Sequence, residues 1–368
     1  MTDQITSTIV PTKKRMVEQD IAKALCIIFV LILHIVSLTE TMTTAFFSIC
    51  GPALIFFFII SGYNYKPRKE TYWKTIKKRF GQIILPMFLY FIAIFVIMGT
   101  YLYICGDIQL SDIGMSVLDV WVNNFGDNLF GIQITPLSDL LVPAWFLKYM
   151  MTGFIIYYAV APWAMSKMSR FYSTCAGLVL IAGIFAYFKI SLPWGMHTSP
   201  AVACFMLIGS MLGRSGVFTD EGQSPKWRAI NGMISFAITF TLGYAFKNGG
   251  NMPGGSLTGI YGASEIPFAI LNGILGTCWL LALGRLIAKS KIISKFMLFI
   301  GRHTLAILVF HQSIAMLLFD IFNVEGPKGG PMPFNPATIL ICITTLVVNC
   351  LGIFAFEQLK KRMHAKHS

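Results

Sequence analysis

Three ionisable residues stand in an otherwise apolar segment near the start of the chain. Asp20, Lys23 and His34 belong to the run DIAKALCIIFVLILH. A helix turns by about 100° per residue, so Lys23 and His34, eleven positions apart, share one face to within roughly 20°. Asp20 lies one turn before Lys23 on that face. A charge at the centre of a membrane costs about 2.5 to 3.5 kcal/mol, so this polar stripe is expected to face the inside of a helix bundle.

Of the residues in this stripe, His34 is the strongest candidate for a chemical role. An ionisable group at that depth usually marks a transport pathway or a reaction site, and we interpret His34 in this way. The simpler alternative is that its ring only hydrogen-bonds a neighbouring helix. For Lys23 taken alone the simpler interpretation is preferred, because a long side chain near a helix end can extend its ammonium group to the membrane surface.

A second buried histidine is expected late in the chain. His311, in IGRHTLAILVFHQ, follows His303 by about two helical turns and should lie well inside its span. Two histidines at mid-depth, His34 and His311, suggest one shared cavity. Arg302 and His303 begin the same helix near the cytoplasmic surface, where Arg302 could equally meet a phosphate or water.

Other basic residues occur near the ends of predicted helices. Lys148, in PAWFLKYM, is expected about one turn inside its span, with its ammonium group extended outward. Residues 65–80, YKPRKETYWKTIKKRF, carry seven basic residues with aromatic ones between them and predict an amphipathic helix at the membrane surface. The simplest function of such a helix is to bind anionic lipid headgroups. A more specific alternative is that it binds the phosphates of a cytosolic ligand such as coenzyme A.

The composition predicts the elements that position these residues. The chain has 368 residues, 55% hydrophobic and 12% charged, and a mean hydropathy of +0.69. These values exclude an ordinary soluble domain and predict an all-α fold, a polytopic membrane helix bundle. A span needs roughly 20 apolar residues. Ten runs approach this length, at about 21–40, 44–63, 81–104, 143–165, 172–189, 199–214, 229–247, 263–284, 301–322 and 335–357.

The distribution of charge explains the net charge of +13 without nucleic-acid binding. With ten spans and a cytoplasmic N-terminus, 23 of the 29 Lys and Arg residues fall on the cytoplasmic side and three fall outside. This positive-inside asymmetry places both termini in the cytoplasm. We divide the chain into a cytoplasmic segment, 1–16, a membrane domain, 17–357, and a basic cytoplasmic tail, 358–368.

Several familiar sites have no counterpart in the sequence. The eight cysteines show no C-x-x-C pair and no metal-ligand spacing, so no metal site is predicted. The chain also lacks G-x-S-x-G, H-x-x-x-x-D, Walker and H-E-x-x-H motifs. A hydrolase of the soluble type and an ATP-driven pump are therefore disfavoured.

Five motifs, taken together and in order, give the chain a family resemblance. It resembles the acyltransferase-3 family of bacterial integral-membrane acyltransferases, and more closely the branch of O-acetyltransferases similar to fucose 4-O-acetylase. The family's first-helix signature is Arg or Lys, ten residues, then His, which Lys23 and His34 match. The other motifs are FFFIISGY (56–63), KKRFGQIILP (77–86), PAWFL (143–147) and IGRHTLAILVFH (300–311). One departure is Gln82, where the family often has Arg.

The resemblance implies transfer of an acyl group, usually acetyl, from cytoplasmic acyl-CoA to a hydroxyl of an extracytoplasmic or lipid-linked glycan. The setting would be the cytoplasmic membrane of a bacterium. His34 would be the general base, or would accept the acyl group first. The implied site residues are catalytic His34, Lys23 and Asp20; donor-binding Lys23, Lys78, Arg79, Arg302 and Ser61; and Trp145, His311 and Lys148 around the acceptor cavity. The expected partners are acetyl-CoA, the glycan and membrane lipids, with no metal and no nucleic acid.

A protein of a different class also fits the sequence. Ten helices with buried titratable groups suit a proton-coupled transporter or flippase of a glycan intermediate. Inverted repeats, which many such transporters contain, are not apparent. Consumption of a thioester would separate the two functions.

Overall fold

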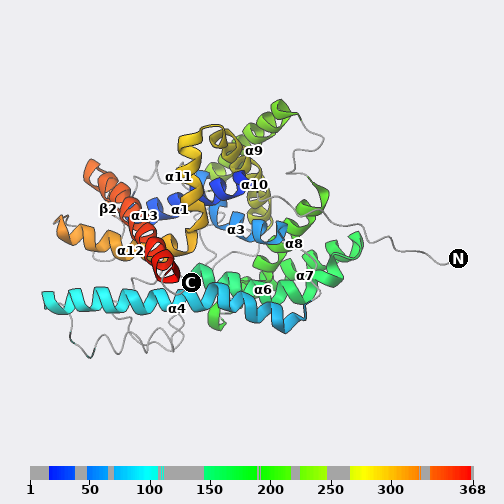
Figure 1. Cartoon of the computed structure of the whole chain (residues 1–368). Coiled ribbons are helices and arrows are strands. Elements are labelled where there is room, and N and C mark those ends of the chain that lie inside the picture. Colours follow the sequence, from blue (N-terminus) through cyan, green and yellow to red (C-terminus); the bar gives the residue numbers. More distant parts are fainter. Residues whose placement is uncertain are drawn as a thin grey trace.

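The computed structural model is a bundle of α-helices (Figure 1). The residues that it describes are 16–37, 48–64, 70–106, 109, 111, 145–188, 190, 192–216, 224–246, 266–322, 324 and 332–365. The helices are α1 (Val17–Ile35), α3 (Pro52–Tyr63), α4 (Tyr72–Cys105), α6 (Trp145–Ala164), α7 (Met168–Tyr187), α8 (Ser199–Ser215), α9 (Pro225–Phe246), α10 (Ile266–Ala288), α11 (Lys291–Arg302), α12 (Thr304–Ile321) and α13 (Pro336–Ala365). A 3-10 turn, η2 (Pro193–Gly195), precedes α8, and two strands of two residues, β1 (Val36–Ser37) and β2 (Met332–Pro333), pair in parallel.

The prediction of an all-α membrane protein is confirmed for the described residues. Five helical segments are long and apolar enough to cross a membrane: Tyr72–Cys105, Met168–Tyr187, Ala269–Ala288, Thr304–Ile321 and Pro336–Met363. Each of the ten predicted runs overlaps one helix of the structure, while the number of spans and the orientation stay predictions. Helix α1 is not among the five because Glu18, Asp20 and Lys23 crowd its first two turns.

The basic segment before the third predicted span is part of one long helix. Helix α4 runs without a break from Tyr72 through Gly81 and Pro86 to Cys105, and Figure 1 shows it along one side of the bundle. The sequence predicted a separate surface helix that ended near residue 80. It was wrong there, because nothing between 72 and 85 stops a helix and Pro86 removes only one intrahelical hydrogen bond.

Helix α11 was missed entirely, since residues 285–300 were assigned to a cytoplasmic loop. One face of α11 is buried through Ser294, Met297, Ile300 and Gly301, which recur every three or four residues as an amphipathic helix requires. The opposite face exposes Ile292. A search for apolar runs of membrane length passes over a helix of this kind because it is short and carries lysines.

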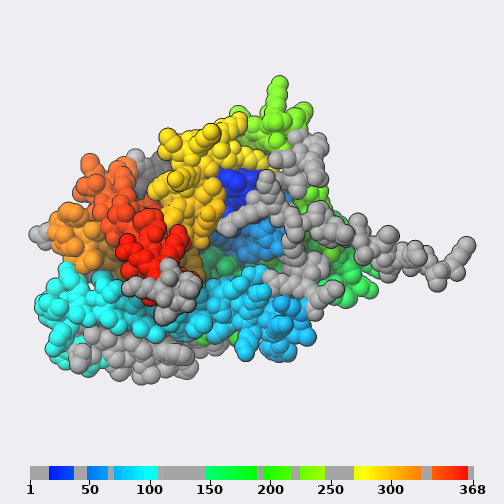
Figure 2. Space-filling view, in the orientation of Figure 1, coloured from blue at the N-terminus to red at the C-terminus, as the bar shows by residue number. Residues whose placement is uncertain are grey.

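Helix α1 occupies the middle of the packing. It contacts α3, α10, α11, α12 and α13, and on the face shown in Figure 2 only a small patch of its blue surface is visible. Two glycines allow the closest approaches: a Cβ at Gly284 of α10 would meet the carbonyl oxygen of Glu18, and one at Gly301 of α11 would overlap that of Asp20. Small residues let helix backbones approach closely in membranes, so α10 and α11 fix the start of α1.

Candidate functional site

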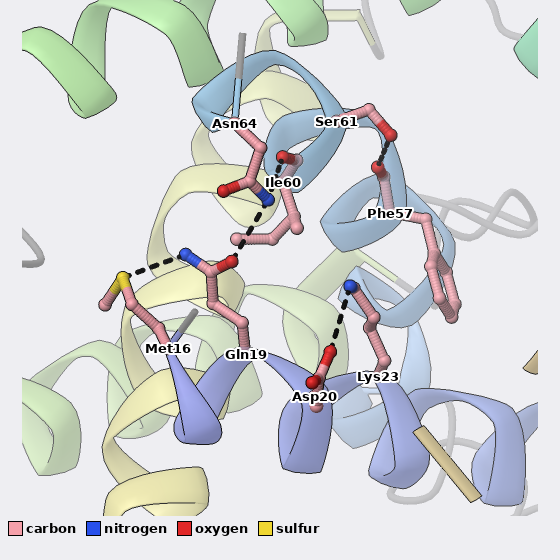
Figure 3. A network of polar contacts seen from close by, with 8 residues as sticks. All are labelled: Met16, Gln19, Asp20, Lys23, Phe57, Ile60, Ser61 and Asn64. Atoms are coloured by element: carbon pink, nitrogen blue, oxygen red, sulfur yellow. Dashed lines mark hydrogen bonds and ion pairs between the residues drawn. The ribbon is translucent and has the colours of Figure 1, made fainter. Parts of the chain in front are cut away.

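The first two turns of α1 carry an ion pair. Lys23 Nζ lies 3.3 Å from Asp20 Oδ1, and the two side chains are 26% and 3% exposed. Asp20 is in the first turn of α1, where a negative charge is stabilised by the helix dipole. A buried carboxylate needs a cationic partner, and Lys23 supplies it while part of the lysine side chain stays accessible. Figure 3 shows Lys23 pointing from α1 toward α3.

A second polar contact, not anticipated from the sequence, ties α1 to the end of α3. Asn64 Nδ2 donates to Gln19 Oε1 at 3.0 Å, and Gln19 Nε2 donates to Met16 Sδ at 3.1 Å. In Figure 3 Gln19 rises from α1 on the same side as Lys23. Gln19 is 4% exposed. In the sequence it stands between Glu18 and Asp20, so no local signal distinguished it from an ordinary polar helix start.

Ser61 and Gly62, the Ser-Gly pair at the end of α3, have different surroundings. Ser61 Oγ donates to the carbonyl oxygen of Phe57 at 2.7 Å, within its own helix. Gly62 lies so close to α8 that a Cβ there would overlap the carbonyl oxygen of Met206. Its carbonyl oxygen also accepts a hydrogen bond from Ser210 at 3.0 Å. The glycine is therefore explained by helix packing, whereas the Ser61 hydroxyl is satisfied locally.

The two predicted buried histidines lie side by side. His34 is in the last turn of α1 and His311 in the middle of α12, with ring centroids 5.1 Å apart and ring planes inclined by 63°. His311 is fully buried, whereas His34 keeps part of its surface exposed. Contacts between α1 and α12 bring together residues that are far apart in the sequence.

Backbone carbonyl groups select the same tautomer for both rings. His34 Nδ1 lies 2.8 Å from the carbonyl oxygen of Val30, and His311 Nδ1 lies 3.1 Å and 2.8 Å from those of Ile307 and Leu308. A carbonyl oxygen only accepts, so Nδ1 must carry the proton in each ring. In the neutral ring Nε2 is then the basic nitrogen. Within the described part of the chain, His311 Nε2 has no hydrogen-bond partner.

Arg79, the basic residue of the KKRF motif, packs against α6. Its Nε donates to Tyr158 Oη at 3.0 Å and its guanidinium carbon lies 4.9 Å from the centre of the Phe154 ring. A further N–H donates to Gln82 Oε1 at 3.2 Å. The residue that departs from the family pattern therefore orients Arg79, while Lys78 is exposed beside it.

Arg302 is brought toward the Asp20–Lys23 pair by the end of α11. Gly301 touches the backbone of Asp20, so Arg302 follows directly on this contact, with its side chain exposed. The next residue, His303, has both ring nitrogens engaged: Nδ1 is 2.8 Å from the carbonyl oxygen of Phe299, and Nε2 is 3.0 Å from Glu357 Oε1 of α13.

Two of the three residues predicted around the acceptor, Trp145 and Lys148, lie at the start of α6, whereas the third, His311, lies in α12 beside His34. Lys148 is 0% exposed. The expectation that its ammonium group extends outward is wrong, because the protein covers the whole side chain. Trp145 begins α6, but its side chain lies outside the described part of the structure. Across the residues that are described, no group of three His, Cys, Asp or Glu side chains could hold a metal ion.

Fold and site define a class: helical membrane proteins whose first helix carries an ion pair at its start and a histidine near its end. Comparison with protein families makes this specific: the model of the acyltransferase-3 family, described as an acyltransferase domain, matches residues 17–353. The chain belongs to the acyltransferase-3 family, whose members are acyltransferases. No curated protein and no solved structure gives a significant match.

Proposed function

We propose that the protein is a membrane O-acetyltransferase of the branch similar to fucose 4-O-acetylase. It moves an acetyl group from cytoplasmic acetyl-CoA to a hydroxyl of an extracytoplasmic or lipid-linked glycan in the cytoplasmic membrane of a bacterium. Family membership supports the reaction class. The observation that carries the assignment to this site is the Nδ1 hydrogen bond of His34 to Val30, which leaves a basic Nε2 on a partly accessible ring.

In the proposed reaction His34 acts as the general base. Its Nε2 takes the hydroxyl proton as the acceptor oxygen attacks the thioester carbonyl, and the carbon–sulfur bond then breaks. The proton returns from His34 to the departing sulfur, so the products are an O-acetyl ester and coenzyme A thiol. A general base contributes about 10² to 10⁴ in rate.

The donor is proposed to approach the start of α1. Lys23, held by Asp20, and Arg302 on the adjoining end of α11 present cations there, and phosphates bind such groups through charge-assisted hydrogen bonds. Lys78, Arg79 and Ser61 complete the proposed donor contacts. In the predicted topology of ten spans with both termini in the cytoplasm, this end of the bundle would face the side where acetyl-CoA is found.

The acceptor is proposed to enter from the opposite side, where Trp145 and Lys148 begin α6. A cytosolic donor and an outer acceptor can meet only inside the bundle, since charged and polar reactants are excluded from lipid. His34, at the far end of α1 from Lys23, would mark the meeting point.

The test is an assay of acetyl transfer with purified protein in lipid discs, radiolabelled acetyl-CoA and a membrane glycan extract. Wild type is compared with His34→Ala and, as a matched control on the same turn of α1, Leu33→Ala. We expect label to reach the glycan with wild type and Leu33→Ala, and the rate to fall 10²- to 10⁴-fold in a folded His34→Ala protein. If wild type binds a glycan lipid without consuming the thioester, the enzyme is ruled out in favour of the flippase.

A further inference from the structure

His311 has an environment that packing alone does not explain. The side chain is 0% exposed, and both carbonyl oxygens near its Nδ1 require a proton on that nitrogen. Its Nε2 therefore carries no proton and can only accept a hydrogen bond. This nitrogen is buried and no hydrogen-bond donor reaches it among the described residues. A buried acceptor without a donor is unfavourable, and an apolar side chain of similar size would avoid the loss. The fold itself has no need of this imidazole.

The neighbouring ring of His34 supplies the missing donor once it is protonated. While both rings are neutral, each Nε2 carries a lone pair and neither can donate, so no hydrogen bond can form between the two Nε2 atoms. An N–H···N bond of about 2.9 Å between two imidazoles sets their ring centres about 5 Å apart. The centroids of His34 and His311 are 5.1 Å apart, so α1 and α12 already hold the two rings at the separation that such a bond requires.

We propose that His311 is the proton partner of His34, a role that rests on the proposed acetyl transfer. When His34 has taken the hydroxyl proton, its Nε2–H donates to the lone pair of His311 Nε2. The imidazolium is thereby stabilised until the proton passes to the coenzyme A sulfur and both rings are neutral again. No other atom is gained or lost, and no further reactant is needed.

The difference in burial assigns the two roles. His34 keeps part of its surface exposed, whereas His311 has none. An acceptor hydroxyl can therefore reach His34 but not His311, and His311 acts through its neighbour as a positioning residue.

Two substitutions and a control separate this role from a structural one. His311→Met fills the space without an acceptor, and His311→Gln restores an acceptor oxygen near the position of Nε2. Ser313→Ala is the control on the same helix, since Ser313 is 3% exposed and its hydroxyl has no partner among the described residues either. Transfer is measured in lipid discs with radiolabelled acetyl-CoA and the glycan extract, beside the thermal unfolding of each protein.

We expect His311→Met to lower kcat about 10- to 100-fold, the range for a hydrogen bond to a charged group, with KM for acetyl-CoA and the melting temperature maintained. His311→Gln should recover most of the rate, and Ser313→Ala should match wild type. An unchanged kcat in His311→Met overturns the partnership and leaves the acetyltransferase intact. A melting temperature that falls with kcat, or equal losses in the Gln and Met variants, overturns it in favour of a packing role. If wild type transfers no acetyl group, the proposed function fails and the partnership fails with it.

Discussion

Three histidines in this protein share one local geometry and differ in what their outer nitrogen meets. In His34, His303 and His311, Nδ1 lies within hydrogen-bonding distance of the carbonyl oxygen four residues earlier. His303 Nε2 then meets Glu357, whereas His311 Nε2 meets no partner in the described structure. A helical backbone fixes the tautomer in every case, so the tautomer alone does not distinguish a reactive ring from a structural one.

The partner of Nε2 indicates which of the three histidines can accept a proton from a substrate. In His303 both ring nitrogens contact oxygen atoms, and the ring links the end of α11 to α13. A ring with a buried or partly exposed lone pair can take up a proton. We therefore propose the pair formed by His34 and His311 as the reactive region, whereas the His303–Glu357 pair links two helices.

The largest effect that tests this comparison is expected from removing histidine side chains one at a time. His34→Ala should lower the rate of acetyl transfer 10²- to 10⁴-fold, as for loss of a general base. His303→Ala should keep the rate within a few fold, because its ring serves a contact between helices. Both are measured with radiolabelled acetyl-CoA in lipid discs. Equal losses in the two variants would show that Nε2 does not mark the reactive ring.

A second prediction concerns Gly301, which lies two residues before His303 and packs α11 against the start of α1. Gly301→Ala should destabilise the protein by about 1 to 3 kcal/mol, the usual cost of overpacking, because its Cβ would overlap the carbonyl oxygen of Asp20. Gly352→Ala in α13 is the control, since nothing lies within 4 Å of the added Cβ. The free energy of unfolding in detergent measures both. If the two variants are equally stable, α1 and α11 are not in close contact.

A third prediction concerns Arg79, a cation that already has hydrogen-bond partners inside the protein. Arg79→Ala should raise KM for acetyl-CoA about tenfold, as expected for loss of one charge-assisted phosphate contact, and change kcat little. Lys77→Ala, exposed two residues earlier, should behave as wild type. Steady-state kinetics check this. A fall in stability without a change in KM would assign Arg79 to the packing of α4 on α6 instead.

The smallest effect is expected from weakening the His303–Glu357 link itself. Glu357→Gln keeps an acceptor but removes the charge, and Glu357 is 42% exposed. Water screens such a pair, so the loss of stability should not exceed about 1 kcal/mol, with transfer unchanged. Thermal unfolding and the transfer assay measure the two quantities. A loss of transfer without unfolding would mean that His303 belongs to the reactive region after all.

Much of the architecture could be predicted because hydrophobic runs are a local property. Composition was sufficient for the all-α membrane class, and each predicted run overlaps a helix. The errors fell where the pattern is amphipathic: α4 begins at Tyr72 instead of near residue 81, and α11 was taken for a loop. Both segments combine lysines with apolar residues and therefore do not stand out in a search for uniformly apolar runs.

By itself the sequence determined that Asp20, Lys23 and His34 share one face of α1, because helical spacing is fixed. Only the tertiary structure decided that His311 lies against His34, that Gly301 sets α11 on Asp20, and that Lys148 is enclosed. These contacts join helices distant in the sequence, and their geometry depends on how side chains of opposing helices fit together. The local periodicity of the sequence does not specify how those side chains fit together.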